Sequence, residues 1–102
     1  MHTSAYDWRM DRVEWNNEKN EQLKRERGVS FEEVIHALSA GLLLDVVQHP
    51  NQEKYPNQLI YVVNINNYVY LVPYVSTGEY IFLKTIIPSR KATRDYLRRK
   101  PR

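Results

Sequence analysis

The stretch that decides the fold is an apolar run interrupted by two asparagines, Leu59-Ile60-Tyr61-Val62-Val63-Asn64-Ile65-Asn66-Asn67-Tyr68-Val69-Tyr70-Leu71-Val72-Pro73-Tyr74-Val75. Its two halves are rich in β-branched and aromatic side chains, which favour strands. Asn66 and Asn67 tolerate the positive φ angles of a tight hairpin turn. We therefore expect two antiparallel strands. Pro73 should produce a bulge or an unpaired position, because proline has no N–H to donate.

Two more strands flank this hairpin in the sequence. Residues 42–47 are apolar and lie between a glycine and the turn-forming His49-Pro50-Asn51, which is typical of a short strand. Residues 80–87 follow a second turn at residues 76–79 and end at Pro88. The pattern predicts a four-stranded, mainly antiparallel sheet.

Two helices are expected before the sheet. Residues 16–27 are rich in helix formers, between the candidate N-cap Asn16 and the candidate C-terminal stop Gly28. The sequence Ser30-Phe31-Glu32-Glu33 is a capping box, and apolar residues then recur at helical spacing. This spacing predicts a second, amphipathic helix.

A last helix is expected after the sheet. Ser89 can cap a helix that runs from Arg90 to about Arg99. The predicted fold class is α+β, with two N-terminal helices, a four-stranded sheet and a C-terminal basic helix. We expect the helices to be grouped on one face of the sheet.

Length and composition limit the number of domains and the cellular compartments that we expect. The chain of 102 residues fits one domain, which we place at residues 13–102. Residues 1–12 are expected to be an N-terminal extension that is either disordered or not native to the protein. There is no cysteine, and no apolar run approaches the roughly 18 residues of a membrane-spanning helix. These features favour the reducing cytoplasm and no contact with a membrane.

The charge is divided unevenly along the chain. Residues 81–102 contain eight Lys or Arg and one acid, whereas residues 1–80 contain seven Lys or Arg and eleven acids. The two parts therefore carry +7 and −4, which together give the net charge of +3. Such asymmetry predicts an anionic partner for the C-terminal end, with nucleic acid first among the candidates. The alternative is a solvated basic tail.

Several kinds of active site are excluded by the residues present. The three glycines lie far apart, so no glycine-rich phosphate loop exists. His2, His36 and His49 do not have the spacing of metal ligands, and no Gly-x-Ser-x-Gly sequence occurs. We therefore expect neither a cofactor nor a bound metal.

Two segments remain as candidate sites. The polar loop 49–58 contains His49, which can transfer protons near neutral pH, together with Lys54 and Tyr55. A lysine can offset phosphate charge, and a tyrosine can stack on a base. The alternative is a loop whose prolines fix its shape and whose tyrosine packs on the sheet.

The second segment is the last strand and the helix after it. Arg90 and Arg94 are four residues apart and share one helix face, which suits phosphate binding unless this face is simply solvated. Metal-free RNA cleavage needs proton transfer and neutralisation of the phosphorane, so we assign catalysis to His49, Arg90 and Arg94. The RNA-binding residues of this hypothesis are Lys54, Tyr55, Lys84, Ser89 and Lys91.

The chain resembles the BrnT family of type II toxins, which have a RelE/ParE-like fold. Residues 13–20, which include Trp15 and Asn20, resemble the opening pattern of the family. Gly28-Val29-Ser30-Phe31-Glu32-Glu33 matches its most recognisable motif, and Ile86-Ile87-Pro88-Ser89-Arg90-Lys91-Ala92-Thr93 resembles its closing element. The resemblance spans nearly the whole domain, from about residue 13 to residue 97.

The resemblance implies a cytoplasmic ribonuclease toxin that inhibits translation by acting on RNA. It implies a cognate antitoxin protein as partner, in a hetero-oligomer or with the toxin as a homodimer. The acidic–arginine pair common on the second strand of the family is not evident here, and Lys54 stands near its place. This departure keeps two other hypotheses open: a non-catalytic toxin-fold module that binds a protein or nucleic acid, and action on a protein target such as gyrase.

Overall fold

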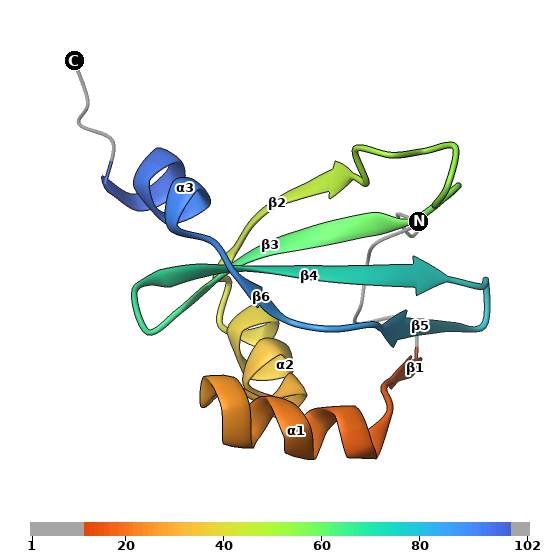
Figure 1. Ribbon diagram of the computed structural model, residues 1–102, viewed down its shortest axis with the longest axis horizontal. Helices are drawn as coiled ribbons and strands as arrows, with labels where there is room; N and C mark the ends of the chain where they lie inside the picture. The colour runs from red at the N-terminus through yellow and green to blue at the C-terminus, as the bar shows by residue number, and fades with distance from the viewer. Residues whose placement is uncertain (1–11, 99–102) are drawn as a thin grey trace.

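The computed structural model describes residues 12–98 and has an α+β architecture (Figure 1). The predicted extension, residues 1–12, lies outside the described residues except for Arg12, which already belongs to the first strand. Within residues 12–98, no helix is long and apolar enough to cross a lipid bilayer. In chain order the elements are β1 (Arg12–Glu14), α1 (Asn17–Arg27), α2 (Phe31–Ser39), β2 (Leu43–Gln48), β3 (Leu59–Ile65), β4 (Tyr68–Ser76), β5 (Tyr80–Leu83), β6 (Ile87–Pro88), α3 (Arg90–Thr93) and the π-helical segment η2 (Arg94–Arg98).

The sheet has more strands than the four predicted. Its order is β1-β5-β4-β3-β2, with β6 also paired to β4. All pairs are antiparallel except β1 with β5, which is parallel, so the sheet is mixed. The prediction missed β1 because three residues are too short to show a strand period. It also joined β5 and β6 into one strand.

The break between β5 and β6 lies beside Pro73. The Lys84 N–H donates to the Pro73 carbonyl at 2.8 Å, but Pro73 has no N–H to return the bond. Tyr74 pairs with Leu83 and Leu71 with Ile87, so three residue steps on β4 face four on the neighbouring segment. The predicted irregularity at Pro73 is therefore confirmed as a bulge in the neighbouring segment.

The apolar core lies between the α1–α2 hairpin and one face of the sheet (Figure 1). Its largest side chains are the fully buried Tyr61 and Tyr74, whose rings stack at 4.0 Å between centroids across β3 and β4. Trp15, just before α1, stacks on Phe31 of α2 at 5.5 Å. The buried apolar residues that complete this cluster are Leu23, Val29, Val34, Ala37, Leu38, Val63, Ile65, Val72, Ile81, Leu83 and Ile86.

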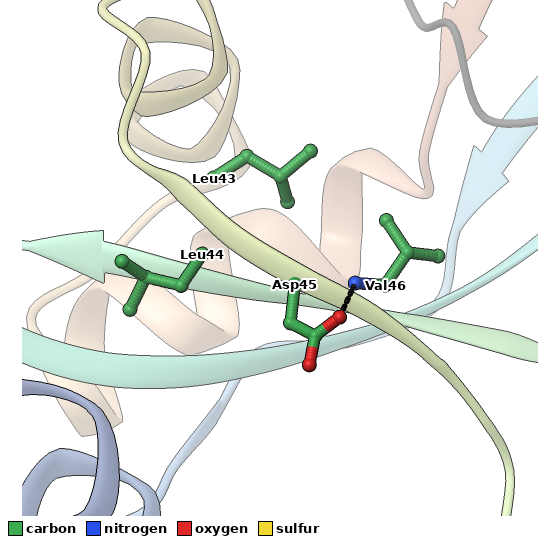
Figure 2. Close-up of a pocket in the computed structure, with 4 residues that line it drawn as sticks. All are labelled: Leu43, Leu44, Asp45 and Val46. Carbon is green, nitrogen blue, oxygen red and sulfur yellow. Dashed lines mark hydrogen bonds between the residues drawn. The ribbon is translucent and has the colours of Figure 1, made fainter.

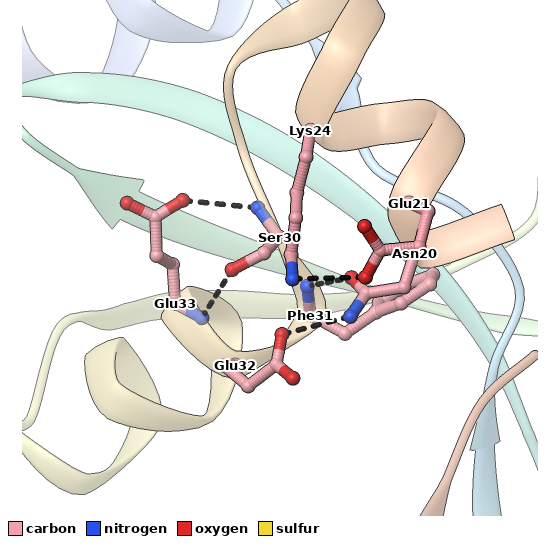
Figure 3. A network of polar contacts seen from close by, with 7 residues as sticks. All are labelled: Asn20, Glu21, Lys24, Ser30, Phe31, Glu32 and Glu33. Carbon is pink, nitrogen blue, oxygen red and sulfur yellow. Dashed lines mark hydrogen bonds and ion pairs between the residues drawn. The ribbon is translucent and has the colours of Figure 1, made fainter. Parts of the chain in front are cut away.

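A buried amide joins the two N-terminal helices (Figure 3). Asn20 is only 2% exposed; its Oδ1 accepts the Phe31 N–H and its Nδ2 donates to Glu32, both at 2.8 Å. The hydrogen bond from the Asn20 side-chain amide is the main cause that lowers the pKa of the Glu32 carboxyl. The predicted capping box is present, because Ser30 accepts the Glu33 N–H while Glu33 accepts the Ser30 N–H. Asn20 therefore fixes the start of α2 against α1.

The predicted grouping of all helices on one face is wrong. Figure 1 shows α3 on the side of the sheet opposite α1 and α2. The register of β2 shifts between Leu43, which pairs with Val63, and Asp45, which pairs with Val62. This bulge turns Asp45 towards the C-terminal segment, where it accepts the Tyr96 hydroxyl at 2.8 Å. The predicted last helix, residues 90–99, is a short α-helix that continues as η2 within the described residues.

Removing the Asn20 amide should destabilise the fold. We expect Asn20→Ala to lower the free energy of unfolding by about 1–3 kcal/mol, because the buried Phe31 N–H loses its acceptor. Gln22→Ala on the same helix removes only an exposed side-chain bond and should change stability by less than about 0.5 kcal/mol. Urea unfolding followed by circular dichroism measures both. Equal stability of the two variants would contradict the role given to Asn20.

Candidate functional site

The loop between β2 and β3 is a closed, internally bonded turn. The His49 N–H donates to the Gln58 carbonyl at 2.9 Å and closes its neck. Asn51 organises its interior, since its Oδ1 accepts the Lys54 N–H at 3.0 Å and its carbonyl accepts the Tyr55 N–H at 2.9 Å. A short polar sequence thus forms a defined turn, because the Asn51 side chain accepts a hydrogen bond from the backbone of the loop.

The three residues predicted for this loop come together. The His49 and Tyr55 rings lie 4.3 Å apart between centroids, and Lys54 Nζ lies 5.4 Å from the centre of the Tyr55 ring. Tyr55 is 37% exposed and contacts these two side chains, so it is not a tyrosine buried on the sheet. The cluster offers an imidazole, an ammonium and an aromatic face to solvent. These are groups that bind a phosphate and a base.

The Ser89 hydroxyl caps the basic helix, and the Thr93 hydroxyl fastens this helix to the sheet. Ser89 caps α3, because its Oγ accepts the Ala92 N–H at 3.0 Å. Thr93 is 2% exposed; its Oγ1 accepts the Val69 N–H and donates to the Ser89 carbonyl, both at 2.8 Å. The Ser89 hydroxyl, predicted to bind RNA, therefore holds the start of the helix.

Among the cations of this helix, Lys91 and Arg94 are paired with an acid, whereas Arg90 and Arg98 are paired with none of the described acids. Asp95 lies 3.1 Å from Lys91 Nζ and 3.4 Å from Arg94 Nε. The bond to Lys91 is the main cause that lowers the pKa of the Asp95 carboxyl. Arg90 and Arg98 are exposed, and within residues 12–98 neither has an acidic partner. One acid thus partly offsets a local cluster of four cations.

The loop and the basic helix lie at opposite ends of the sheet (Figure 1). Leu59, which follows the loop, pairs with Tyr74 near the end of β4, whereas the Ser89 N–H donates to the Val69 carbonyl near its start. The five residue steps between these points on β4 correspond to about 17 Å at the usual rise of a strand. One phosphate cannot contact both segments.

The predicted catalytic residues are therefore not brought together. His49 lies in the loop, and Arg90 and Arg94 lie on the distant helix. The backbone N–H of the exposed Lys84 is bonded to Pro73, at the same end of β4 as the loop. Lys84 nevertheless lies three strand spacings from β2, a distance of roughly 14 Å. The assignment of roles to these side chains stays a prediction.

A further polar pair was not predicted. Asp45 on β2 accepts the Val46 N–H with Oδ1 at 2.8 Å and the Tyr96 hydroxyl with Oδ2, and this bond is the main cause that raises the pKa of Tyr96. A hollow of about 260 Å³ along β2 is lined by Leu43, Leu44, Asp45 and Val46. Figure 2 shows these four side chains. The one sequence signal was an aspartate inside an apolar strand. Its partner is 51 residues away along the chain and could not be inferred.

A search for metal-binding clusters in the described part of the chain and three comparisons with known proteins gave no further residues for the candidate site. Within residues 12–98, no group of three or more His, Cys, Asp or Glu side chains is placed to hold a metal ion. Comparison with protein-family models, curated proteins and solved structures gave no match.

Several residues of the motifs quoted for the family resemblance have structural roles. Asn20, Ser30, Phe31 and Glu33 build the junction of α1 and α2, and Thr93 docks the basic helix. These positions explain how the fold is held together.

Docking of the basic helix should depend on the Thr93 hydroxyl. We expect Thr93→Val to lower the free energy of unfolding by about 1–3 kcal/mol, because the buried Val69 N–H loses its acceptor while the side-chain volume is kept. Thr93→Ser retains the hydroxyl and serves as the matched control, with a smaller loss. Denaturant titration measures both variants. A valine variant as stable as the serine variant would show that the bond is dispensable.

Proposed function

We propose that this protein is the toxin of a type II toxin–antitoxin system, a cytoplasmic, metal-independent endoribonuclease that inhibits translation. The proposal includes a RelE/ParE-like version of the α+β fold. It also includes a cognate antitoxin that neutralises the enzyme. The sequence resemblance to the BrnT family suggests the system, and one structural observation supports the chemistry.

That observation is the cluster of His49, Lys54 and Tyr55 on one ordered loop. Its rings lie 4.3 Å apart, and the ammonium lies 5.4 Å from the phenol ring. Hydrogen-bond donors and a cation held in place can stabilise the charge of a phosphorane without a metal. The exposed Tyr55 ring can stack on an unpaired base, which is how single-stranded RNA is commonly read. We therefore assign cleavage to the loop.

The basic helix then has a separate role. Arg90, Lys91, Arg94 and Arg98 lie too far from the loop to contact the same phosphate, but they suit the backbone of the same RNA strand further along. Lys84 is exposed near the loop end of β4 and adds positive charge there. The long-range positive charge of the basic helix would attract RNA before the loop binds it.

Loss of the His49 side chain should abolish toxicity. Expression of the wild-type protein without antitoxin is expected to arrest growth, and the purified protein should cleave single-stranded RNA in the presence of EDTA. His49→Ala should slow cleavage by about 10²–10³-fold, the usual effect of removing one group that stabilises the transition state. His36→Ala replaces an exposed histidine on α2 and should retain wild-type activity. Intact RNA and normal growth with the wild-type protein would refute the enzyme.

The basic helix should contribute salt-dependent affinity. Arg90→Ala is expected to weaken binding to a non-cleavable 2′-deoxy oligonucleotide and to reduce the slope of log affinity against log salt by about 0.7, one phosphate contact. Arg25→Ala removes an exposed arginine of α1 and provides the control. Fluorescence anisotropy at several salt concentrations measures the slopes. Identical slopes for the two variants would remove the helix from the interface.

A second function is favoured by the separation of the two candidate segments. A toxin-fold module that only binds RNA or a partner protein needs no single centre that combines His49 with Arg90 and Arg94. Salt-dependent RNA binding without any cleavage would select this alternative.

A further inference from the structure

The loop fixes which nitrogen of His49 carries hydrogen. The Asn51 backbone N–H lies 3.0 Å from His49 Nδ1. A backbone N–H can only donate, so Nδ1 must be the unprotonated acceptor. The hydrogen of the neutral imidazole is therefore on Nε2. Within residues 12–98, Nε2 has no hydrogen-bond partner, which leaves this N–H available to a ligand.

The turn resists the other arrangement of the ring. A hydrogen on Nδ1 would face the Asn51 N–H, so two donors would meet without an acceptor. Asn51 is held in place by its bonds to the Lys54 and Tyr55 N–H groups. Gln52 Nε2 also donates to the His49 carbonyl at 2.6 Å, and the Tyr55 ring contacts the imidazole. The neutral side chain therefore presents a donor.

We propose that His49 donates a hydrogen bond from Nε2 to a phosphodiester oxygen, beside the Lys54 ammonium, and does not act as a general base. Asn51 is the positioning residue that holds the imidazole in this state. The ligand class is a phosphodiester whose neighbouring base stacks on Tyr55. This inference rests on the proposed function and specifies the role of the loop within it.

The reaction remains balanced without a histidine base. The 2′-oxygen forms a bond to phosphorus, and its proton passes to water. The bond from phosphorus to the 5′-oxygen breaks, and this oxygen takes a proton from water. His49 and Lys54 stabilise the charge on the non-bridging oxygens. The hydrogen on Nε2 stays in place throughout.

Nitrogen NMR of the full-length protein tests the tautomer directly. In ¹⁵N-labelled protein above neutral pH, we expect the His49 Nδ1 signal of an unprotonated acceptor and a scalar coupling to the Asn51 amide nitrogen across their hydrogen bond. Titration with inorganic phosphate should shift the His49 Nε2–H signal and leave that of His36 unchanged. A protonated Nδ1, or an Nε2–H signal that does not respond to phosphate, would overturn the proposal.

Substitution of His49 distinguishes a role as hydrogen-bond donor from a role as general base. Glutamine offers an N–H near the position of Nε2 but cannot accept a proton at neutral pH, so His49→Gln should cleave RNA within about tenfold of wild type. His49→Ala should lose about 10²–10³-fold. Equal losses in the two variants would overturn the donor role. If the wild-type protein cleaves no RNA, the proposed function fails, while the NMR experiment still decides the tautomer and the phosphate contact.

The role of Asn51 is tested by a conservative pair of variants. Asn51→Ala should weaken the coupling to His49 Nδ1 and slow cleavage by roughly 10–100-fold, because the donor is no longer held in place. Asn51→Asp keeps the acceptor for the Lys54 N–H and should restore both the coupling and most of the rate. An alanine variant with unchanged coupling and rate would overturn the positioning role.

Discussion

The hydrogen-bonded ladders on both sides of β4 are the constraint on which the rest of the structure depends. β3 is registered on one side along seven residue pairs, and β5 and β6 share the other side. The basic helix is attached to the start of this strand through Val69, and the loop of His49 lies beyond its far end. A rigid strand therefore sets the distance between the two candidate segments, and no side-chain rotation can close it.

Local patterns in the sequence predicted the parts of the fold that depend on neighbours along the chain. The asparagine hairpin is present with φ angles of 55° and 68° at Asn66 and Asn67, and Gly28 ends α1 at a φ of 66°. The short β1 strand and the side on which α3 lies could not be predicted. Both depend on pairings between distant segments, β1 with β5 and Asp45 with Tyr96, which leave no periodic signal in either segment.

The same division applies to the candidate site. His49, Lys54 and Tyr55 lie within seven residues, so one turn was sufficient to bring them together as the sequence suggested. The prediction of one catalytic centre that combines His49 with Arg90 and Arg94 rested on chemical compatibility alone. In the structure, the length of β4 separates His49 from the two arginines. Family-like motifs were also weak guides to chemistry, because residues such as Asn20 satisfy buried backbone groups. Sequence similarity at such positions reports the requirements of folding.

The attachment of the C-terminal segment has a dynamic consequence. Between residues 90 and 98, only Thr93 is buried, and the hydroxyl groups of Thr93 and Tyr96 bond the segment to the sheet. Val62 and Val69 are buried but lie outside the main core, on the sheet face that carries α3, so detachment would also expose apolar surface and raise the heat capacity. Such a segment opens at lower free energy than the sheet and exchanges its amide hydrogens sooner. Opening of this segment therefore has to replace two hydroxyl hydrogen bonds with bonds to water and to uncover Val62 and Val69.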